Sequence, residues 1–288
     1  MKILVLGDFT SAPCGIRNFA DQTYRALCNH PGLEVAKWDG HYPELYRRRE
    51  ACEPAVYLPE DAASYDVIHV NWHPIAFNTY GPGHFPDGPL LSVYLNDIPP
   101  WSGCPFHDQA HVRFTAEPSP GCIVLPYPVA DCIDLSPADP GFSVGCSTVR
   151  GDGVWKVEEI CTERGWEFRV PDRSKGWLTY EQEVQRIARN TVNVLWYFEG
   201  RGKSGGLSQA ISSRRPVVCS ASQMFTHFAS YRDELYCGAH DTPLEEILEY
   251  VHKDWQAGTL RRPLQAAVEM SWSNATTQMV AAWEAARS

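Results

Sequence analysis

Short apolar segments alternate with amphipathic ones along the chain. In the first half, the apolar segments expected to be strands cover residues 1–7, 33–38, 65–70, 90–95, 111–115 and 122–125. Between the first two, residues 15–29 place Ile16, Phe19, Tyr24 and Leu27 near one face, as in a helix that packs on a sheet. Strands separated by helices or long connections favour a mostly parallel sheet that is covered on both faces.

The pattern breaks at residues 130–140, where prolines and acidic residues suit a linker between domains, and then begins again. Thr179 is an expected N-cap, and Gln182 can complete a capping box with it. Residues 243–285 contain two or three further helices. The remaining elements expected in this half are strands over 141–147, 166–170, 192–198 and 216–220, and helices over 153–164, 179–189 and 205–213.

Two successive α/β domains are therefore predicted, over residues 1–135 and 136–270. Residues 271–288 are expected to form a C-terminal helix that packs back toward the first domain. Open sheets of this kind bind ligands at the carboxyl ends of their strands. Two such domains facing each other would bind a ligand in the cleft between them.

Composition narrows the class of protein. The chain has 288 residues, 44% of them hydrophobic, which is enough for one large core or two smaller ones. No apolar run approaches the roughly 18 residues of a membrane span, and the opening MKILVLGDF is interpreted as a buried strand, so a cytoplasmic protein is expected. The net charge of -10 argues mildly against a nucleic-acid partner.

Neither the cysteines nor the histidines indicate a metal site. The chain has ten cysteines but no C-x-x-C pair, and Cys122, Cys146 and Cys219 lie in apolar runs that suit buried thiols. His107 and His111 are four residues apart and could share a helix face. Loop or surface histidines are the favoured interpretation, and no metal is expected.

A glycine-rich segment at residues 198–218 carries the strongest chemical signal. It contains the Gly-Lys-Ser tail of a P-loop, but Tyr197 occupies the position where that motif requires glycine. The segment instead connects a predicted strand to a helix that begins near Gly205. Glycines at such a turn let backbone amides approach an anion, and the helix dipole favours negative charge there, so a diphosphate is the expected ligand.

This segment resembles the donor signature of retaining GT-B glycosyltransferases of the family 4-like group, E-G-F-G-L-P-x-x-E-A-x-A-x-G-x-P-V-V. The matching pieces are Glu199-Gly-Arg-Gly202, Leu207-Ser-Gln209-Ala210 and Arg215-Pro-Val-Val218. Other parts of the chain also resemble family motifs, and they occur in the family's order. These parts are Gly15-Ile16-Arg17, Tyr65-Asp-Val-Ile-His69, Tyr94-Leu-Asn-Asp97, Val124 to Val129 and Met270-Ser-Trp-Ser273. The resemblance implies a short, divergent member with two Rossmann-like domains facing a central cleft.

The resemblance also implies transfer of a sugar from a nucleoside diphosphate sugar to a hydroxyl group, with retention of configuration. The diphosphate would lie on the amides of Gly205, Gly206 and Leu207, aided by Lys156 or Arg150. Cations and helix amides then stabilise the leaving group, so neither a metal nor a further cofactor is required.

The remaining site residues follow from the same resemblance. Glu199 would hold the donor sugar and Gln209 the ribose, while Gly15 and Arg17 would close over the donor. Asp97 is the best acid or base candidate on the acceptor side. The expected acceptor is soluble: a saccharide, a small metabolite, a protein or a hydroxymethylated DNA base.

Two departures from the family pattern keep other functions open. The family has two glutamates eight positions apart, whereas Glu199 and Gln209 are ten apart and the second is an amide. The family also carries an arginine where Cys146 follows Gly145 here. An inactive GT-B relic that serves as a binding or partner protein, or another GT-B enzyme such as a sugar-nucleotide epimerase, are the alternatives.

Overall fold

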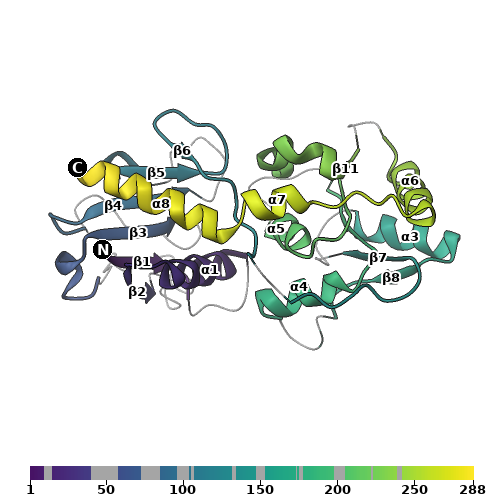
Figure 1. Ribbon diagram of the computed structural model, residues 1–288, viewed down its shortest axis with the longest axis horizontal. Helices are drawn as coiled ribbons and strands as arrows, with labels where there is room; N and C mark the ends of the chain where they lie inside the picture. Colours follow the sequence, from purple (N-terminus) through teal and green to yellow (C-terminus); the bar gives the residue numbers. More distant parts are fainter. Residues whose placement is uncertain are drawn as a thin grey trace, which may run out of the picture. The chain divides into compact units, whose positions relative to one another are not determined.

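The computed structural model describes residues 1–9, 15–39, 58–72, 85–95, 104, 107–131, 134–146, 153–172, 174, 178–197, 205–221, 223–238 and 242–288. The chain forms two compact units (Figure 1): Met1–Pro126 together with Trp272–Ser288, and Tyr127–Ser271. The division falls before residue 127, earlier than the expected boundary after residue 135. None of the helices in these ranges combines the length and apolarity needed to cross a bilayer.

The first unit contains a parallel sheet with the strand order β2-β1-β3-β4-β5-β6. All residues of β3 and β4 are buried, which is why both strands are largely apolar on both faces, with His69 and Asn71 on β3 and Ser92 on β4 as buried polar residues. The strands are β1 (Lys2–Gly7), β2 (Glu34–Asp39), β3 (Val67–Trp72), β4 (Leu90–Leu95), β5 (Val112–Thr115) and β6 (Ile123–Val124).

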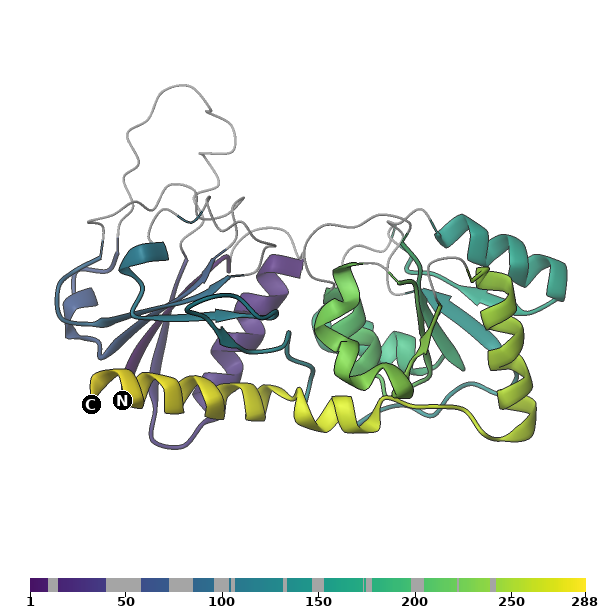
Figure 2. The same cartoon turned by 90° about the horizontal axis from the view of Figure 1, so that it is seen from above.

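Helices α1 (Gly15–Asn29) and α8 (Trp272–Arg287) pack together beside this sheet (Figures 1 and 2). Trp283 of α8 is fully buried, and its Nε1 donates a hydrogen bond of 2.8 Å to Ser92 Oγ on β4. The far end of the sequence therefore completes the core of the first unit. The other face of the sheet buries an apolar cluster beneath the short 3-10 helices η1 (Ala62–Ser64) and η2 (His107–Gln109).

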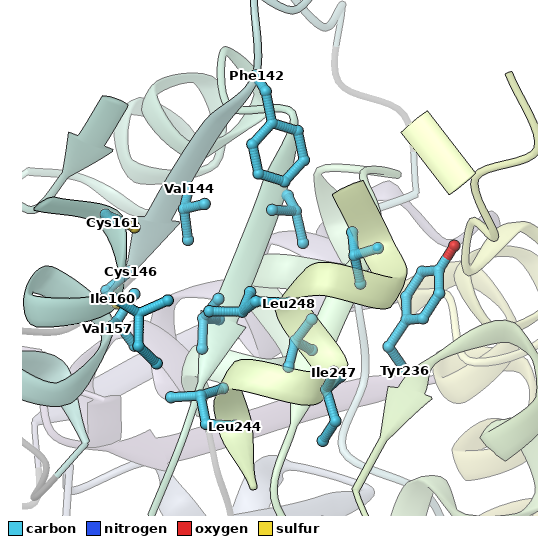
Figure 3. Packing of buried hydrophobic residues seen from close by; sticks show 14 residues of the cluster. Phe142, Val144, Cys146, Val157, Ile160, Cys161, Tyr236, Leu244, Ile247 and Leu248 are labelled. Atoms are coloured by element: carbon cyan, nitrogen blue, oxygen red, sulfur yellow. The ribbon is translucent and has the colours of Figure 1, made fainter. Parts of the chain in front are cut away.

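The second unit has a parallel sheet of its own, in the order β11-β10-β9-β7-β8. Helices α3 (Val154–Arg164) and α6 (Leu244–Ala257) pack on one face, where Val144, Ile160 and Leu248 meet (Figure 3). The strands are β7 (Ser143–Cys146), β8 (Glu167–Arg169), β9 (Val192–Leu195), β10 (Val217–Cys219) and β11 (Tyr236–Cys237). The elements on the opposite face are α4 (Tyr180–Ala188), α5 (Gly205–Ser212), η4 (Gln223–Glu234) and α7 (Leu264–Glu269).

Most predicted elements occur where the sequence places them. The capping box is confirmed: Thr179 Oγ1 accepts a hydrogen bond from the Gln182 amide, and the Gln182 side chain accepts one from the Thr179 amide. The expected linker over 130–140 lies within the second unit instead. There, Ala130 N donates to Ser212 Oγ, and Asp139 pairs with Arg169, so the described part of the segment is bound to helix α5 and strand β8.

Candidate functional site

Strand order locates the ligand-binding edge of each sheet. In both units the first strand lies between the second and the third: β2-β1-β3 in the first unit and β8-β7-β9 in the second. Doubly wound sheets bind ligands outside the carboxyl ends of their strands at this point, because the connections there leave to opposite faces. The candidate positions are therefore the carboxyl ends of β1 and β3, and of β7 and β9.

Two helices of the second unit begin at this edge. Helix α3 follows β7, and helix α5 follows β9 and begins at Gly205. The first amides of a helix have no partner within it and carry the positive end of the helix dipole, so both helix starts favour an anion. A Cβ built on Gly205 would lie 3.8 Å from the Tyr127 hydroxyl, so a phenol oxygen lies beside the first turn of α5.

Trp196, directly after β9, lies at the carboxyl edge of the second sheet, next to two glycines. A Cβ on Gly153 would lie 2.5 Å from the Trp196 carbonyl oxygen, and one on Gly238 would lie 2.9 Å from the Trp196 ring. A larger residue at Gly153 would therefore displace the backbone at Trp196, and one at Gly238 would displace the side chains of Ile247 and Trp196. Two glycines thus allow the start of α3 and the end of β11 to close around Trp196.

Gly205, Gly206 and Leu207 form the first turn of α5, at the carboxyl edge where the diphosphate is expected. The Leu207 side chain is fully buried in the core, so only its backbone faces this end of the helix. Gln209 lies in the next turn and is half-buried. That these four residues contact a ligand remains a prediction.

Lys156 lies in the first turn of α3, but its charge already has a partner. Its Nζ is 3.0 Å from Glu159 Oε2, and this hydrogen bond raises the pKa of the Lys156 ammonium. Because the pair is exposed, the interaction is weak. A phosphate could compete with Glu159 for Lys156.

A second cation lies at the end of β7 and was not foreseen from the sequence. Arg186 of α4 donates a hydrogen bond of 2.7 Å to the Cys146 carbonyl oxygen. It also donates two hydrogen bonds, of 2.7 and 3.1 Å, to the buried Glu183 carboxylate. This carboxylate balances the guanidinium charge, so Arg186 anchors the end of β7 to α4. The Glu183/Arg186 spacing of three residues on a helix is the signal that could have revealed the pair.

Of the predicted catalytic residues, Arg17 alone is among the described residues, while Glu199, Asp97 and the cation candidate Arg150 lie outside them. Arg17 is in the first turn of α1, which begins at Gly15, and its Nε is 3.6 Å from Asp21 Oδ2. Arg17 therefore forms an ion pair with Asp21, one helical turn further along α1 in the first unit.

The two histidines considered for a metal do not share a helix face. η2 contains only three residues, and His111 Nδ1, beyond its end, accepts a hydrogen bond from the Leu91 amide at 3.0 Å. His107 Nδ1 lies 3.0 Å from Asp108 Oδ1. Within the described ranges, no group of three or more His, Cys, Asp or Glu side chains is placed to hold a metal ion.

Buried polar groups without partners lie at the carboxyl end of β3 in the first unit. Asn71 is buried, and among the described residues neither its Oδ1 nor its Nδ2 makes a hydrogen bond of standard geometry, although the amide lies close enough to the His69 ring to favour its protonated form. His69, two residues earlier on the same face, bonds Ser92 Oγ through Nδ1, while its Nε2 makes no standard hydrogen bond within the described part of the chain. Burial lowers the pKa of His69 to about 3. Sequence reasoning missed Asn71 because the predicted strand over 65–70 ends one residue before it, whereas the structure extends β3 through Trp72.

Comparisons with known proteins bear on the fold. No protein-family model matches the chain, and no curated protein sequence matches it. Solved structures do match over nearly its full length. AviGT4, a glycosyltransferase involved in avilamycin A biosynthesis, is 14% identical with a TM-score of 0.61, covering 99% of this chain and 97% of its own.

Two further structures have higher TM-scores. Anabaena Alr3699/HepE in complex with UDP-glucose is 12% identical with a TM-score of 0.66, and the match covers 99% of this chain and 100% of HepE. A glycosyltransferase from Rickettsia africae is 8% identical with a TM-score of 0.69, with coverage of 99% and 98%. The chain has the GT-B fold, two Rossmann-like units with parallel sheets, and the fold class predicted from the sequence is confirmed.

Proposed function

We propose that this chain is a glycosyltransferase that uses a nucleoside diphosphate sugar and retains the configuration of the transferred sugar. The observation that carries the proposal is the start of α5. Two glycines open this helix at the carboxyl edge of the second sheet, directly after the segment that resembles the family's donor signature. The full-length likeness to AviGT4 and to HepE, which was solved with UDP-glucose, supports it.

In the proposed reaction an acceptor oxygen forms a bond to the anomeric carbon of the donor sugar, and the bond from that carbon to the diphosphate breaks. The acceptor proton passes to the leaving phosphate oxygen. The charge that develops on the diphosphate is stabilised by the amides of Gly205, Gly206 and Leu207, which are already oriented before the reaction. We assign no metal to this step, because helix amides and cations supply the stabilisation.

The remaining roles follow the sequence resemblance. Glu199 holds hydroxyl groups of the donor sugar, and Gln209 bonds the ribose as a neutral amide. Lys156 or Arg150 supplies the cation for the diphosphate, Lys156 by exchanging Glu159 for phosphate. Asp97, two residues beyond the end of β4, is the acid or base candidate for a soluble acceptor.

The start of α5 allows a sharp test with an isosteric pair of variants, Gly205→Asp and Gly205→Asn. A Cβ at this position would make only an ordinary van der Waals contact, at 3.8 Å from the Tyr127 hydroxyl, and the Asp and Asn side chains have nearly the same size, so any steric effect is common to both variants. An aspartate at a helix start favours the fold through the dipole but repels a diphosphate, while asparagine does not repel it. A sugar nucleotide at 100 times its dissociation constant should stabilise wild type by about 2.7 kcal/mol.

The measurement is thermal unfolding with UDP, GDP, ADP and their common sugars. We expect one sugar nucleotide to stabilise wild type and Gly205→Asn, and to have little effect on Gly205→Asp. Glu199→Ala should weaken the response to the sugar nucleotide more than the response to the nucleotide alone, with Glu158→Ala, an exposed carboxylate of α3, as control. Equal responses of the Asp and Asn variants would remove α5 from the site.

Turnover separates transfer from the alternatives. A transferase releases nucleoside diphosphate faster when its acceptor is present, and the anomeric NMR signal of the product reports retention. Release without any acceptor product would favour an epimerase. Binding without release, or no response to any donor, would favour the inactive relic.

A further inference from the structure

Two cysteine side chains meet on neighbouring strands at the edge of the second sheet. Strands β10 and β11 are parallel, and their register pairs Cys219 with Cys237. The two Sγ atoms are 3.1 Å apart. A disulfide bond is about 2.05 Å long. The sulfurs therefore need to approach by only about 1 Å to become bonded.

The two thiols differ in their access to solvent. Cys219 is 1% exposed, whereas Cys237 is partly exposed. Strand β11 has only two residues, and in the described part of the sheet it pairs with β10 alone. A reagent from solution therefore reaches Cys237 first, and Cys219 lies directly behind it.

The pKa shifts of the two thiols also distinguish Cys237 from Cys219. The hydrogen bond to Cys237 and burial raise the pKa of Cys219 well above its usual value. The hydrogen bond from Cys219 lowers the pKa of Cys237, and the nearby Arg232 guanidinium lowers it further, against the effect of burial. The thiolate is the nucleophile in cysteine chemistry, so Cys237 is the attacking group and Cys219 the resolving one.

We propose that Cys219 and Cys237 form a redox-active dithiol, which a small-molecule disulfide of the glutathione class oxidises to an intramolecular disulfide. The Cys237 thiolate attacks one sulfur of the oxidant, whose S–S bond breaks to release one glutathione thiolate. Cys219 then loses its proton to solvent and attacks Cys237 Sγ, which releases the second glutathione. Two electrons pass from the two protein thiols to the oxidant, and two glutathione molecules are formed.

Other buried cysteines of the second unit lack this arrangement. Burial raises the pKa of both Cys146 and Cys161 to about 12, so neither supplies a thiolate near neutral pH. Cys161, on α3, is 1% exposed, like Cys219. It is therefore a matched control for a buried thiol without an activated partner.

The cross-link would fix the edge strand β11 close to Trp196, which lies at the candidate site. Gly238 follows Cys237 directly, its amide donates to the Cys219 carbonyl oxygen at 3.2 Å, and it packs against Trp196. A disulfide would hold this corner in place. The thiol chemistry itself does not depend on the proposed glycosyl transfer, so its test stands apart from that function.

The test exposes the folded, full-length protein to mixtures of oxidised and reduced glutathione, followed by acid quenching, alkylation of the remaining thiols and peptide mapping by mass spectrometry. Wild type should lose two hydrogen atoms and yield a cross-linked pair of peptides that contain Cys219 and Cys237. In Cys219→Ala, the mixed disulfide with glutathione should accumulate on Cys237. Cys161→Ala should form the cross-link as wild type does.

A second measurement needs no variant. In a brief pulse of iodoacetamide on the reduced, folded wild type, Cys237 should be alkylated well before Cys219 and Cys161. The proposal fails if Cys237 stops at the glutathione adduct in wild type, or if both thiols stay reduced in excess oxidised glutathione. It fails equally if the cross-link forms only after denaturation, or if Cys161 is alkylated as fast as Cys237.

Discussion

The third strand of each sheet carries a buried asparagine, and the two asparagines are satisfied very differently. Strands β3 and β9 hold corresponding places, each beside the first strand of its sheet. Asn193, near the amino end of β9, accepts a hydrogen bond from Asn190 and donates to Ile187 O and Ser213 Oγ. Asn71, near the carboxyl end of β3, makes no hydrogen bond of standard geometry to any described residue through either amide atom.

This difference teaches which polar groups serve the fold. A buried amide with all its hydrogen bonds formed stabilises a unique packing. A buried amide without hydrogen bonds costs free energy, and a bound ligand that forms those bonds would remove this cost. Asn193 lies at the end of the sheet where ligands do not bind, and Asn71 at the end where they do. Among the described residues, the first unit therefore carries an amide without a standard hydrogen bond at the carboxyl edge of its sheet, where a ligand is expected, and the predictions below test that contrast.

The largest effect is expected from Trp283, which joins the C-terminal helix to Ser92 of β4. The side chain is 0% exposed, so Trp283→Ala should lower the free energy of unfolding by about 3–5 kcal/mol. Trp283→Phe keeps most of the packing and loses the hydrogen bond to Ser92, which should cost about 1 kcal/mol.

Urea unfolding measures these losses, with hydrogen exchange of the β4 amides as the readout for the first unit. The control is Trp155→Ala, because Trp155 on α3 is 60% exposed and should change stability by no more than about 0.5 kcal/mol. Equal losses from Trp283→Ala and Trp155→Ala would show that α8 does not complete the first core.

A smaller effect should follow from pH through His69. Its pKa is about 3 in the folded unit and about 6.5 in the unfolded chain, so the unfolded chain binds the extra proton between these values. Stability should therefore fall as pH drops below about 6.5, by roughly 1.4 kcal/mol per pH unit. Among the described residues, the ring lies beside Ser92, Asn71, Phe114 and Trp283, and none of these four carries a negative charge.

The measurement is urea unfolding from pH 7 to pH 5. His69→Gln should flatten the slope, because glutamine does not titrate, while His30→Gln should leave it as in wild type. His30 lies just after α1 and is partly exposed. A slope that persists in His69→Gln would assign the acid sensitivity to other groups.

Local signals in the sequence predict most of the fold. The helix over 15–29 has the predicted bounds, and so does the mostly apolar strand β4. The sequence does not reveal η4 or β11. η4 lacks a regular apolar period, and β11 has two residues, so only its pairing with β10 makes it a strand.

The candidate site, like the fold, has a part that the sequence predicts and a part that it does not. The glycine-rich start of α5 is a local feature and was predicted from the sequence. The hydroxyl of Tyr127 beside Gly205 depends on how distant segments fold together, as does the bond of Trp283 to Ser92 across 191 residues. No periodicity or motif encodes such contacts, and they are where sequence reasoning ends.

The smallest effect on stability, and the most informative one, is expected from Asn71→Leu. Leucine has nearly the shape of asparagine but needs no hydrogen bonds, so the variant should keep the wild-type stability or gain about 1 kcal/mol. The same change at Asn193 leaves the buried Asn190 Nδ2 without its hydrogen bond and should cost about 1–3 kcal/mol, while Ser213 Oγ keeps its bonds to Ala210 and Arg215.

Both variants are compared by urea unfolding and, once a donor and an acceptor are known, by kcat/KM for the acceptor. If the Asn71 amide is held ready for a ligand, Asn71→Leu should be as stable as wild type and yet turn over more slowly. A loss of stability as large as that of Asn193→Leu would mean that Asn71 has structural partners after all. Stability and activity together therefore decide whether the unbonded amide at the end of β3 serves the fold or a ligand.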